Sequence, residues 1–327
     1  MPANLTPEYL AAEEQFKQAK TSPEKIAALE EMLRTIPKHK GTEKMQADLK
    51  RRLSKLRGES GKKHGAKTAP PVYYVPREGA GQVALVGPAN TGKSSLLARV
   101  THATPEIADY PFTTRLPQPG MMPFENIQIQ LVDLPPLDRA FGEAWVPQAI
   151  RNADAAVLVV DLAAAEVLDQ VAETLARLEE SRIVLGHTTE PVPLGGVRKP
   201  ALLVGNKLDT AGARATWEAL ADLWRERFPQ QAVSTRTGEG LEEFRRAVFD
   251  LLGIVRVYTK APGKKPDVTA PFILPRGATI VDVAARVHKD FTATLKFARV
   301  WGHSRFDGQM VQRDYRVEDQ DVVELHV

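Results

Sequence analysis

Residues 87–94 read GPANTGKS and match the phosphate-binding pattern G-x-x-x-x-G-K-[ST] in full. The glycines let the backbone curl so that several N–H groups face one phosphate, and the following helix start adds partial positive charge. Lys93 is placed to reach the β- and γ-phosphates, and Ser94 is placed to ligate Mg²⁺. The alternative is a chance glycine-rich turn, but the apolar strand before the motif and the helix-forming segment after it favour a phosphate loop. The residues expected to contact nucleotide here are Gly87, Asn90, Thr91, Gly92, Lys93, Ser94 and Ser95.

A second motif, NKLD at 206–209, indicates which base is read. The Asp209 carboxylate can accept hydrogen bonds from N1–H and the 2-amino group of guanine, whereas adenine would leave it unpaired. We expect Asn206 and Lys207 to brace this loop and cover the base. In the segment VSTRTG at 233–238, Ser234 and Thr235 are placed so that a backbone N–H contacts the guanine carbonyl, although such a pair alone is more often an ordinary loop.

Residues for a metal ion and for catalysis lie between these two motifs. Asp133 ends the apolar segment IQIQLVD and is predicted to hold Mg²⁺ through water, unless it is only a strand-end residue in a turn. Thr113 and Thr114 supply a hydroxyl for Mg²⁺ and the γ-phosphate. We expect Lys93 and Thr114 to serve catalysis, with the backbone near Thr114 placing the attacking water.

The elements that position these residues follow from the apolar pattern. Short apolar strands alternate with helices from residue 82 onward, which predicts an α/β domain with a parallel-rich sheet. The strands are expected at 82–87, 127–133, 155–161 and 201–206, and the helices near 93–101, 164–181, 213–228 and 239–252. After Gly253 the pattern predicts a compact α+β unit, with strands in IVRVYT, APFILP and VVELHV and one helix near 279–290. The predicted domains are a basic helical leader and linker at 1–70, a P-loop domain at 71–253 and the α+β unit at 254–327.

Composition narrows the class of protein. The 327 residues include no cysteine, which excludes disulfides, iron–sulfur clusters and thiolate zinc sites. No apolar run is long enough to span a membrane, and the N-terminus lacks a secretory pattern, so we expect a cytoplasmic protein without a membrane partner. Nothing in the sequence demands a dimer, so a monomer is expected.

Charge is unevenly spread along the chain. Residues 1–70 contain 15 Lys/Arg and 9 Asp/Glu, residues 71–253 contain 17 and 23, and residues 254–327 contain 12 and 9. The basic helix at 41–57 has two readings: a solvated charged face whose leucines pack on the P-loop domain, or a contact with RNA or the ribosome. A basic, partly aromatic surface is expected in the last domain from Tyr258, Lys260, Lys264, Lys265, His288, Lys289, Trp301, His303 and Arg305.

The ordered set GPANTGKSS, YPFTT at 110–114, DLPP at 133–136, NKLD and STRTG resembles the Obg/Drg branch of small GTPases. The C-terminal region, including FILPRGATIVDVAARVHKDF and ARVWG, resembles a Drg-type TGS domain of β-grasp-like fold, and PKHKGTEKMQADLKRRLSKLR resembles the Drg helical leader. The resemblance spans about residues 22–327. It implies a protein that binds GTP or GDP with Mg²⁺, hydrolyses GTP slowly and associates with ribosomes. Asn90 matches a loop residue linked to K⁺ in related GTPases, unless it only shapes the loop.

Two features depart from that family pattern. The pattern Asp-x-Pro-Gly places a glycine N–H on the γ-phosphate, but Pro136 stands here and has no N–H. Leu137 follows, so no glutamine orients the attacking water, as is normal for this branch. The interval from Asp133 to Asp209 is too short for the additional domain that typical Drg proteins carry, and 186–200 reads only as a Pro/Gly-rich loop.

Three functions remain open at this point. The first is a GTPase that engages the ribosome, favoured by the intact phosphate loop and Asp133. The second is a nucleotide-binding adaptor with negligible turnover, favoured by Pro136. The third is a sensor in which the TGS domain binds a small ligand.

Overall fold

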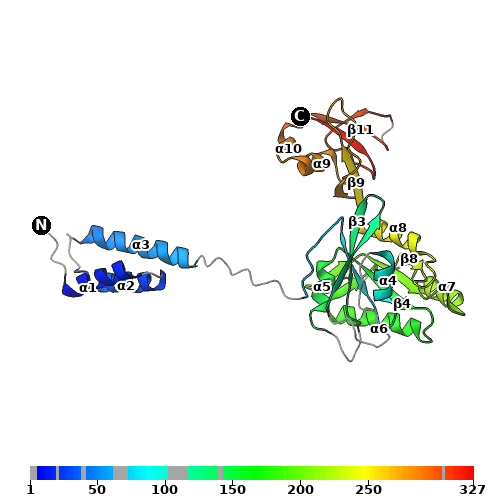
Figure 1. Ribbon diagram of the computed structural model, residues 1–327, viewed down its shortest axis with the longest axis horizontal. Coiled ribbons are helices and arrows are strands. Elements are labelled where there is room, and N and C mark those ends of the chain that lie inside the picture. Colours follow the sequence, from blue (N-terminus) through cyan, green and yellow to red (C-terminus); the bar gives the residue numbers. More distant parts are fainter. Residues whose placement is uncertain are drawn as a thin grey trace. The chain divides into compact units, whose positions relative to one another are not determined.

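The computed structural model describes residues 6–19, 22–37, 42–61, 73–101, 116–137, 143–189, 191–303 and 306–327. The chain divides into two compact units, Met1–Pro71 and Val72–Val327. Figure 1 shows the helices and strands of the two units. Within the described residues, no helix combines the length and the apolar character that crossing a membrane requires.

The first unit is helical and has its own apolar core. Its described helices are α1 (Pro7–Gln18), α2 (Ser22–Thr35) and α3 (Glu43–Gly61). Helix α1 begins where the Thr6 hydroxyl accepts a hydrogen bond from the Tyr9 backbone N–H, with a proline in the first turn. Leu49 of α3 packs with Leu29 and Met32 of α2. The apolar stripe of the basic helix therefore has a partner within its own unit.

The second unit opens with a six-stranded sheet in the order β2-β3-β1-β4-β7-β8. Its strands are β1 (Gln82–Val86), β2 (Gln118–Phe124), β3 (Ile127–Asp133), β4 (Ala155–Asp161), β7 (Ala201–Asn206) and β8 (Gln230–Ala232). All neighbours pair in parallel except β2 with β3. Both faces are covered, which explains the continuous apolar runs of the central strands. The predicted α/β domain with a parallel-rich sheet is confirmed.

Helices cover the two faces of this sheet in separate layers. The helices are α4 (Lys93–Val100), α5 (Val146–Asn152), α6 (Val167–Glu180), α7 (Ala213–Trp224) and α8 (Leu241–Leu252). Apolar residues of α5, α6 and α7 form one core cluster with the sheet, and those of α4 and α8 form the other. The segment predicted as a loop at 186–200 contains the short strand β6 (Val197–Lys199), which pairs in parallel with β5 (Ile183–Leu185).

A second sheet, in the order β10-β9-β13-β11-β12, forms the C-terminal part of this unit. Its elements are β9 (Ile254–Thr259), β10 (Phe272–Pro275), α9 (Ile280–Val287), α10 (Phe291–Thr294), β11 (Phe297–Trp301), β12 (Gln309–Val311) and β13 (Val322–His326). Helix α9 begins with a capping box between Thr279 and Asp282, and its apolar side packs on Val255 and Val257 of β9. The expected α+β unit is therefore present, with β11 and β12 in addition to the three strands predicted.

Candidate functional site

The phosphate loop joins the end of β1 to the start of α4. Gly87 has φ 143° and Gly92 has φ 87°, both in the left-handed region. A Cβ atom on Gly87 would lie 2.3 Å from the Val159 carbonyl oxygen, and one on Gly92 would lie 2.2 Å from Asn206 Nδ2. Only glycine fits at either position. No side chain caps the start of α4, so its first backbone N–H groups stay available for an anion.

Lys93 lies beneath this loop with its ammonium group held by backbone. Its side-chain Nζ donates to the carbonyl oxygens of Gly87 at 3.1 Å and Pro88 at 2.6 Å. Burial lowers the pKa of Lys93 to about 8, against the opposing effect of the Asp133 carboxylate. The side chain therefore carries a positive charge at neutral pH, in a position to neutralise phosphate.

Asp133, at the end of β3, is buried and forms a hydrogen bond with Ser94, the half-buried residue that follows Lys93. The Ser94 hydroxyl donates to Asp133 Oδ2 at 2.5 Å, while Oδ1 is buried and has no hydrogen-bond partner among the described residues. Burial raises the pKa of Asp133, although the Ser94 hydrogen bond and the Lys93 charge work in the opposite direction. Mg²⁺ prefers oxygen ligands, and a hydroxyl next to a carboxylate oxygen that has no hydrogen bond offers two of them. The residues present therefore fit the predicted metal ion.

Asn206 connects three segments that are distant in sequence. Its Nδ2 donates to the Thr91 carbonyl oxygen at 2.9 Å, and its Oδ1 accepts from the Thr235 backbone N–H at 3.2 Å. The next residue, Lys207, has φ 66° and forms an ion pair of 2.5 Å with Asp161 at the end of β4. The motif at 206–209 is thus tied to both the phosphate loop and the 233–238 segment.

Asp209 presents its carboxylate beside that last segment. Ser234 Oγ donates to its Oδ1 at 2.5 Å, and Arg236 Nη2 lies 2.5 Å from its Oδ2. The Ser234 hydrogen bond holds the pKa of Asp209 below its ordinary value. An ionised carboxylate can accept hydrogen bonds from both donors on the guanine edge, whereas a protonated carboxyl group would place a donor against one of them. Sequence reasoning missed Arg236 and Asp161, although Arg236 stands in STRTG and Asp161 ends an apolar strand as Asp133 does.

The remaining predicted site residues fall into two groups. Ser95 lies in the first turn of α4, and Asn90 is exposed at the tip of the phosphate loop with φ 61°. Thr113 and Thr114, together with the rest of YPFTT, lie outside the described residues. The roles expected of Thr114 stay predictions.

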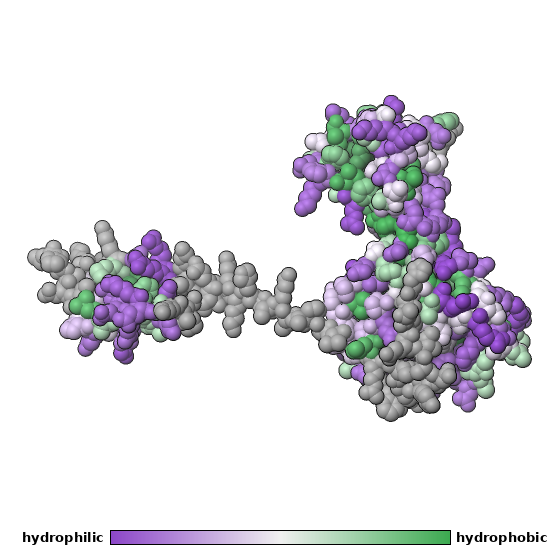
Figure 2. Space-filling model, in the orientation of Figure 1, coloured by the Kyte–Doolittle hydropathy of each residue, from purple (hydrophilic) through white to green (hydrophobic). Residues whose placement is uncertain are grey.

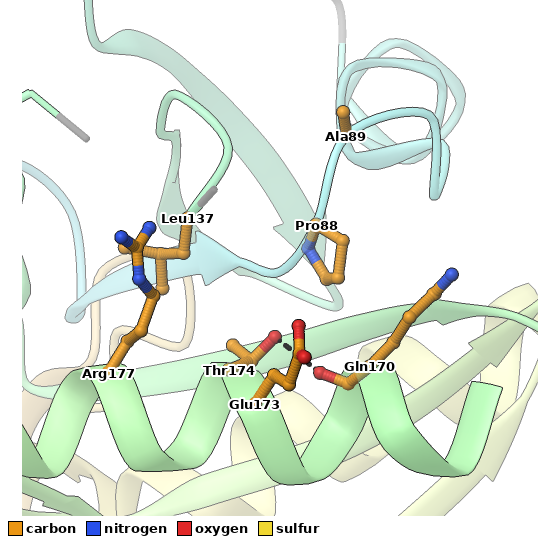
Figure 3. A pocket seen from close by; sticks show the side chains of 7 residues that line it. All are labelled: Pro88, Ala89, Leu137, Gln170, Glu173, Thr174 and Arg177. Atoms are coloured by element: carbon orange, nitrogen blue, oxygen red, sulfur yellow. Dashed lines mark hydrogen bonds between the residues drawn. The ribbon is translucent and has the colours of Figure 1, made fainter. Parts of the chain in front are cut away.

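Pro136 is buried beside the phosphate loop. It has no N–H to donate, and the following Leu137 donates its backbone N–H to the Gly87 carbonyl oxygen at 3.3 Å. A pocket of about 310 Å³ adjoins this contact. Figure 3 shows Leu137 and Pro88 on one side of it and the side chains of α6 on the other. The pocket is lined by Pro88, Ala89, Leu137, Gln170, Glu173, Thr174 and Arg177.

The basic residues expected on the C-terminal domain do not form one patch. Lys260 Nζ lies 3.8 Å from the centre of the Trp301 ring, on the sheet face opposite α9. His288 and Lys289 instead follow the end of α9, on the other face. Arg305 lies outside the described residues.

Two family models match the chain. Residues 82–189 match a model described as 50S ribosome-binding GTPase, and residues 255–327 match the TGS domain. The first match contains the phosphate loop and Asp133, and the second extends from the second residue of β9 through β13.

Sequence relatives cover nearly the whole chain. It is 30% identical to an uncharacterized GTP-binding protein of Methanocaldococcus jannaschii, over 92% of each chain. It is 27% identical to developmentally-regulated GTP-binding protein 2 of Homo sapiens, over 92% of this chain and 98% of the relative. Among solved structures, the G domain of T. maritima FeoB is 23% identical, with a TM-score of 0.35 over 52% of this chain and 97% of that one. The alignments with the first two relatives extend over 362 and 365 positions, more than the 327 residues present here, so the relatives contain residues that this chain lacks. The chain belongs to the Drg family of GTP-binding proteins, with a GTPase domain followed by a TGS domain.

Proposed function

We propose that this chain hydrolyses GTP to GDP and phosphate, slowly and with Mg²⁺ bound beside the phosphate loop. Membership of a GTPase family implies GTP hydrolysis in general. The observation that carries the proposal for this chain is the hydrogen bond between Ser94 and the buried Asp133, which places a hydroxyl and a carboxylate oxygen without a described partner next to Lys93.

Different residues of this site would bind the phosphates and the base of the nucleotide. The N–H groups at the start of α4 and the Lys93 ammonium group bind the β- and γ-phosphates and stabilise charge in the transition state. Asp209 accepts from the guanine edge and excludes adenine. When bound, Mg²⁺ neutralises charge on the phosphate oxygens. Asn90 is the residue that would hold K⁺, which would add further positive charge, and the backbone near Thr114 would place the attacking water.

Turnover measurements on the full chain test this proposal. We expect release of phosphate from GTP with Mg²⁺, faster in potassium than in sodium buffer, and none from ATP. The affinities for GDP and for a non-hydrolysable GTP analogue are measured alongside. If GTP binds but no phosphate is released in either salt, hydrolysis is excluded and the chain is a nucleotide-binding adaptor.

The buried Pro136 favours that adaptor as the second candidate, because no N–H is available where the family pattern has one. We predict that Pro136→Gly raises GTP turnover about 10-fold, because it restores a backbone donor to the γ-phosphate. The affinity for the GTP analogue relative to GDP is expected to rise as well. Pro135→Gly is the matched control, since it adds the same freedom one residue earlier without restoring that donor. Unchanged turnover and unchanged nucleotide preference in Pro136→Gly would contradict the proposal that the missing N–H at Pro136 limits hydrolysis.

We further propose a ribosome or RNA partner for the basic N-terminal unit. Residues 1–70 contain 15 Lys/Arg against 9 Asp/Glu. On the face shown in Figure 2, the coloured residues of this unit are mainly hydrophilic. On α3, Arg51 and Arg52 both pair with Asp48, so one carboxylate faces two exposed guanidinium groups, and Lys50 adjoins them. This excess of cations supports binding to phosphates with release of counterions.

Co-sedimentation of the full chain with ribosomes at increasing salt tests the partner. We expect binding to weaken as salt rises, and the triple variant Lys50→Gln, Arg51→Gln, Arg52→Gln to bind more weakly with a shallower salt dependence. The control replaces Lys17, Lys25 and Arg34 of α1 and α2 with glutamine, which removes equal charge elsewhere in the unit. Equal binding by both triple variants would argue against a contact through α3.

A further inference from the structure

A buried arginine stands at the start of the TGS domain. Arg256 of β9 is 1% exposed, and its guanidinium group forms a two-point pair with Asp319, at 3.1 Å from Nε to Oδ1 and 2.7 Å from Nη2 to Oδ2. The same group lies 5.6 Å from the Phe124 ring centre and 5.0 Å from that of Phe249, both in the GTPase domain. Arginine suits this position because its planar fork pairs with carboxylates and stacks on rings at once.

The remaining donors of this guanidinium reach the turn between β2 and β3. Arg256 Nη1 lies 2.5 Å from Glu125 Oε2 and 3.2 Å from Asn126 Oδ1. Asn126 in turn donates its Nδ2 to the Tyr258 hydroxyl at 2.6 Å and to the Val268 carbonyl oxygen at 3.2 Å. The hairpin turn of the GTPase domain is therefore held by two residues on one face of β9.

Backbone strain marks the same contact. In the described part of the chain, five residues other than glycine have positive φ. Asn90 and Lys207 belong to the nucleotide site, whereas Glu125 at 49° and Gln320 at 71° meet at the turn, where Gln320 Nε2 donates to Glu125 Oε2 at 3.3 Å. Residues other than glycine seldom adopt such conformations, which are found mainly in tight turns and at functional sites.

The other end of this hairpin is the metal site. Strands β2 and β3 pair over their whole length, from Phe124 opposite Ile127 at the turn to Gln118 opposite Asp133. Asp133 carries the hydrogen bond from Ser94, and β2 directly follows the segment that contains Thr114. Residues 130–133 of β3 also pair with β1 in the central sheet, so the paired backbone of β2 and β3 connects the turn directly to Asp133 and to the strand that leads into the phosphate loop.

We propose that Arg256 is a positioning residue for GTP hydrolysis: it fixes the β2–β3 hairpin from the TGS domain and so couples that domain to Asp133. The inference rests on the proposed GTPase function. Because coupling between two sites is reciprocal, the nucleotide bound at one end of the hairpin also changes the TGS contacts at the other. A partner of the TGS domain would act on GTP through this route.

The test removes the GTPase side of the contact and leaves the TGS side intact. Glu125→Ala keeps Asp319 paired with Arg256, so the TGS domain retains its buried ion pair. We expect kcat for GTP to fall about 5- to 20-fold while KM changes less than about 2-fold, since no phosphate or base contact is touched. Glu125→Gln retains an acceptor oxygen and is expected to recover most of the lost turnover.

A second readout does not depend on hydrolysis. Hydrogen exchange of the backbone amides at 254–260 and 318–321 is compared with GDP and with a non-hydrolysable GTP analogue. We expect the two nucleotides to give different exchange in the unmodified chain and equal exchange in Glu125→Ala. If the unmodified chain shows this difference but releases no phosphate, the proposed hydrolysis fails while the coupling stands.

A matched control exists in the same domain. Glu179 pairs with Arg227 at 2.9 Å, and that guanidinium also lies over two rings, those of Trp224 and Phe228. Glu179→Ala therefore breaks an equivalent contact away from the hairpin and is expected to leave kcat and the exchange pattern unchanged. The proposal is overturned if Glu179→Ala lowers kcat as much as Glu125→Ala does. It is also overturned if Glu125→Ala changes neither kcat nor exchange, or if exchange in the unmodified chain does not depend on the nucleotide.

Discussion

Replacing Asp209 with asparagine is expected to lower the affinity for GDP by about 10³-fold and to create affinity for xanthosine diphosphate. The Ser234 hydroxyl keeps the carboxylate ionised, and the two carboxylate oxygens, which contact Ser234 and Arg236, each retain a lone pair for one donor of the guanine edge. In Asp209→Asn, an NH₂ group replaces one acceptor and faces the 2-amino group of guanine, so two donors oppose each other. Xanthine has a carbonyl at that position, which accepts from the new amide.

Competition binding with GDP and with xanthosine diphosphate measures this change in base preference. Binding of xanthosine diphosphate also serves as the control for correct folding. Retained affinity for xanthosine diphosphate shows that the fold and the phosphate loop are intact, because the phosphates still need Lys93 and the start of α4. A variant that keeps its GDP affinity within about 3-fold would contradict the role of Asp209, since a site built on paired hydrogen bonds discriminates far more strongly.

The second large effect is expected at the metal site. We predict that Asp133→Asn lowers GTP turnover by about 100-fold, which corresponds to about 2.7 kcal/mol of lost transition-state stabilisation. The amide has the same shape and keeps an oxygen for the Ser94 hydroxyl, but it removes the negative charge that would hold Mg²⁺. The stimulation of GDP binding by Mg²⁺ is expected to disappear in the variant, so that chelation of the metal changes its GDP affinity little.

Stability separates this functional role from a structural one. Burial raises the pKa of Asp133, so the ionised carboxylate opposes folding at neutral pH, and the free energy of unfolding without nucleotide should not fall in Asp133→Asn. Asp154→Asn is the control, because that carboxylate binds the Gln82 backbone N–H and Arg77 before β4, and it should leave turnover unchanged. Normal Mg²⁺ dependence in Asp133→Asn would exclude the proposed metal role.

Much of the nucleotide site could be predicted from the sequence because its chemistry is local. The phosphate loop needs glycine at two positions and lysine at a fixed spacing, and the structure shows the close approaches that demand them at Gly87 and Gly92. The central strands were predictable because strands buried on both faces read as continuous apolar runs. The order of the motifs also indicated the family, which the relatives confirm.

Elements without a local signal were missed. Strand β2 contains Pro119 and Pro123, residues that argue against a strand in sequence but are tolerated at the edge of a sheet. The positions of Asp161 and Arg236 at a strand end and in STRTG were not enough to identify them as site residues, because they reach their partners, Lys207 and Asp209, only after the strands assemble.

The sequence by itself therefore determined the ligand class, the base and the α/β fold, since short motifs and apolar periodicity encode them directly. Only the tertiary structure decided where the two domains of the second unit contact each other. Glu125 and Arg256 are 131 residues apart and carry no motif, yet they meet 2.5 Å apart. Their contact arises from the packing of a hairpin against a strand, and residue type and spacing along the chain do not encode such packing.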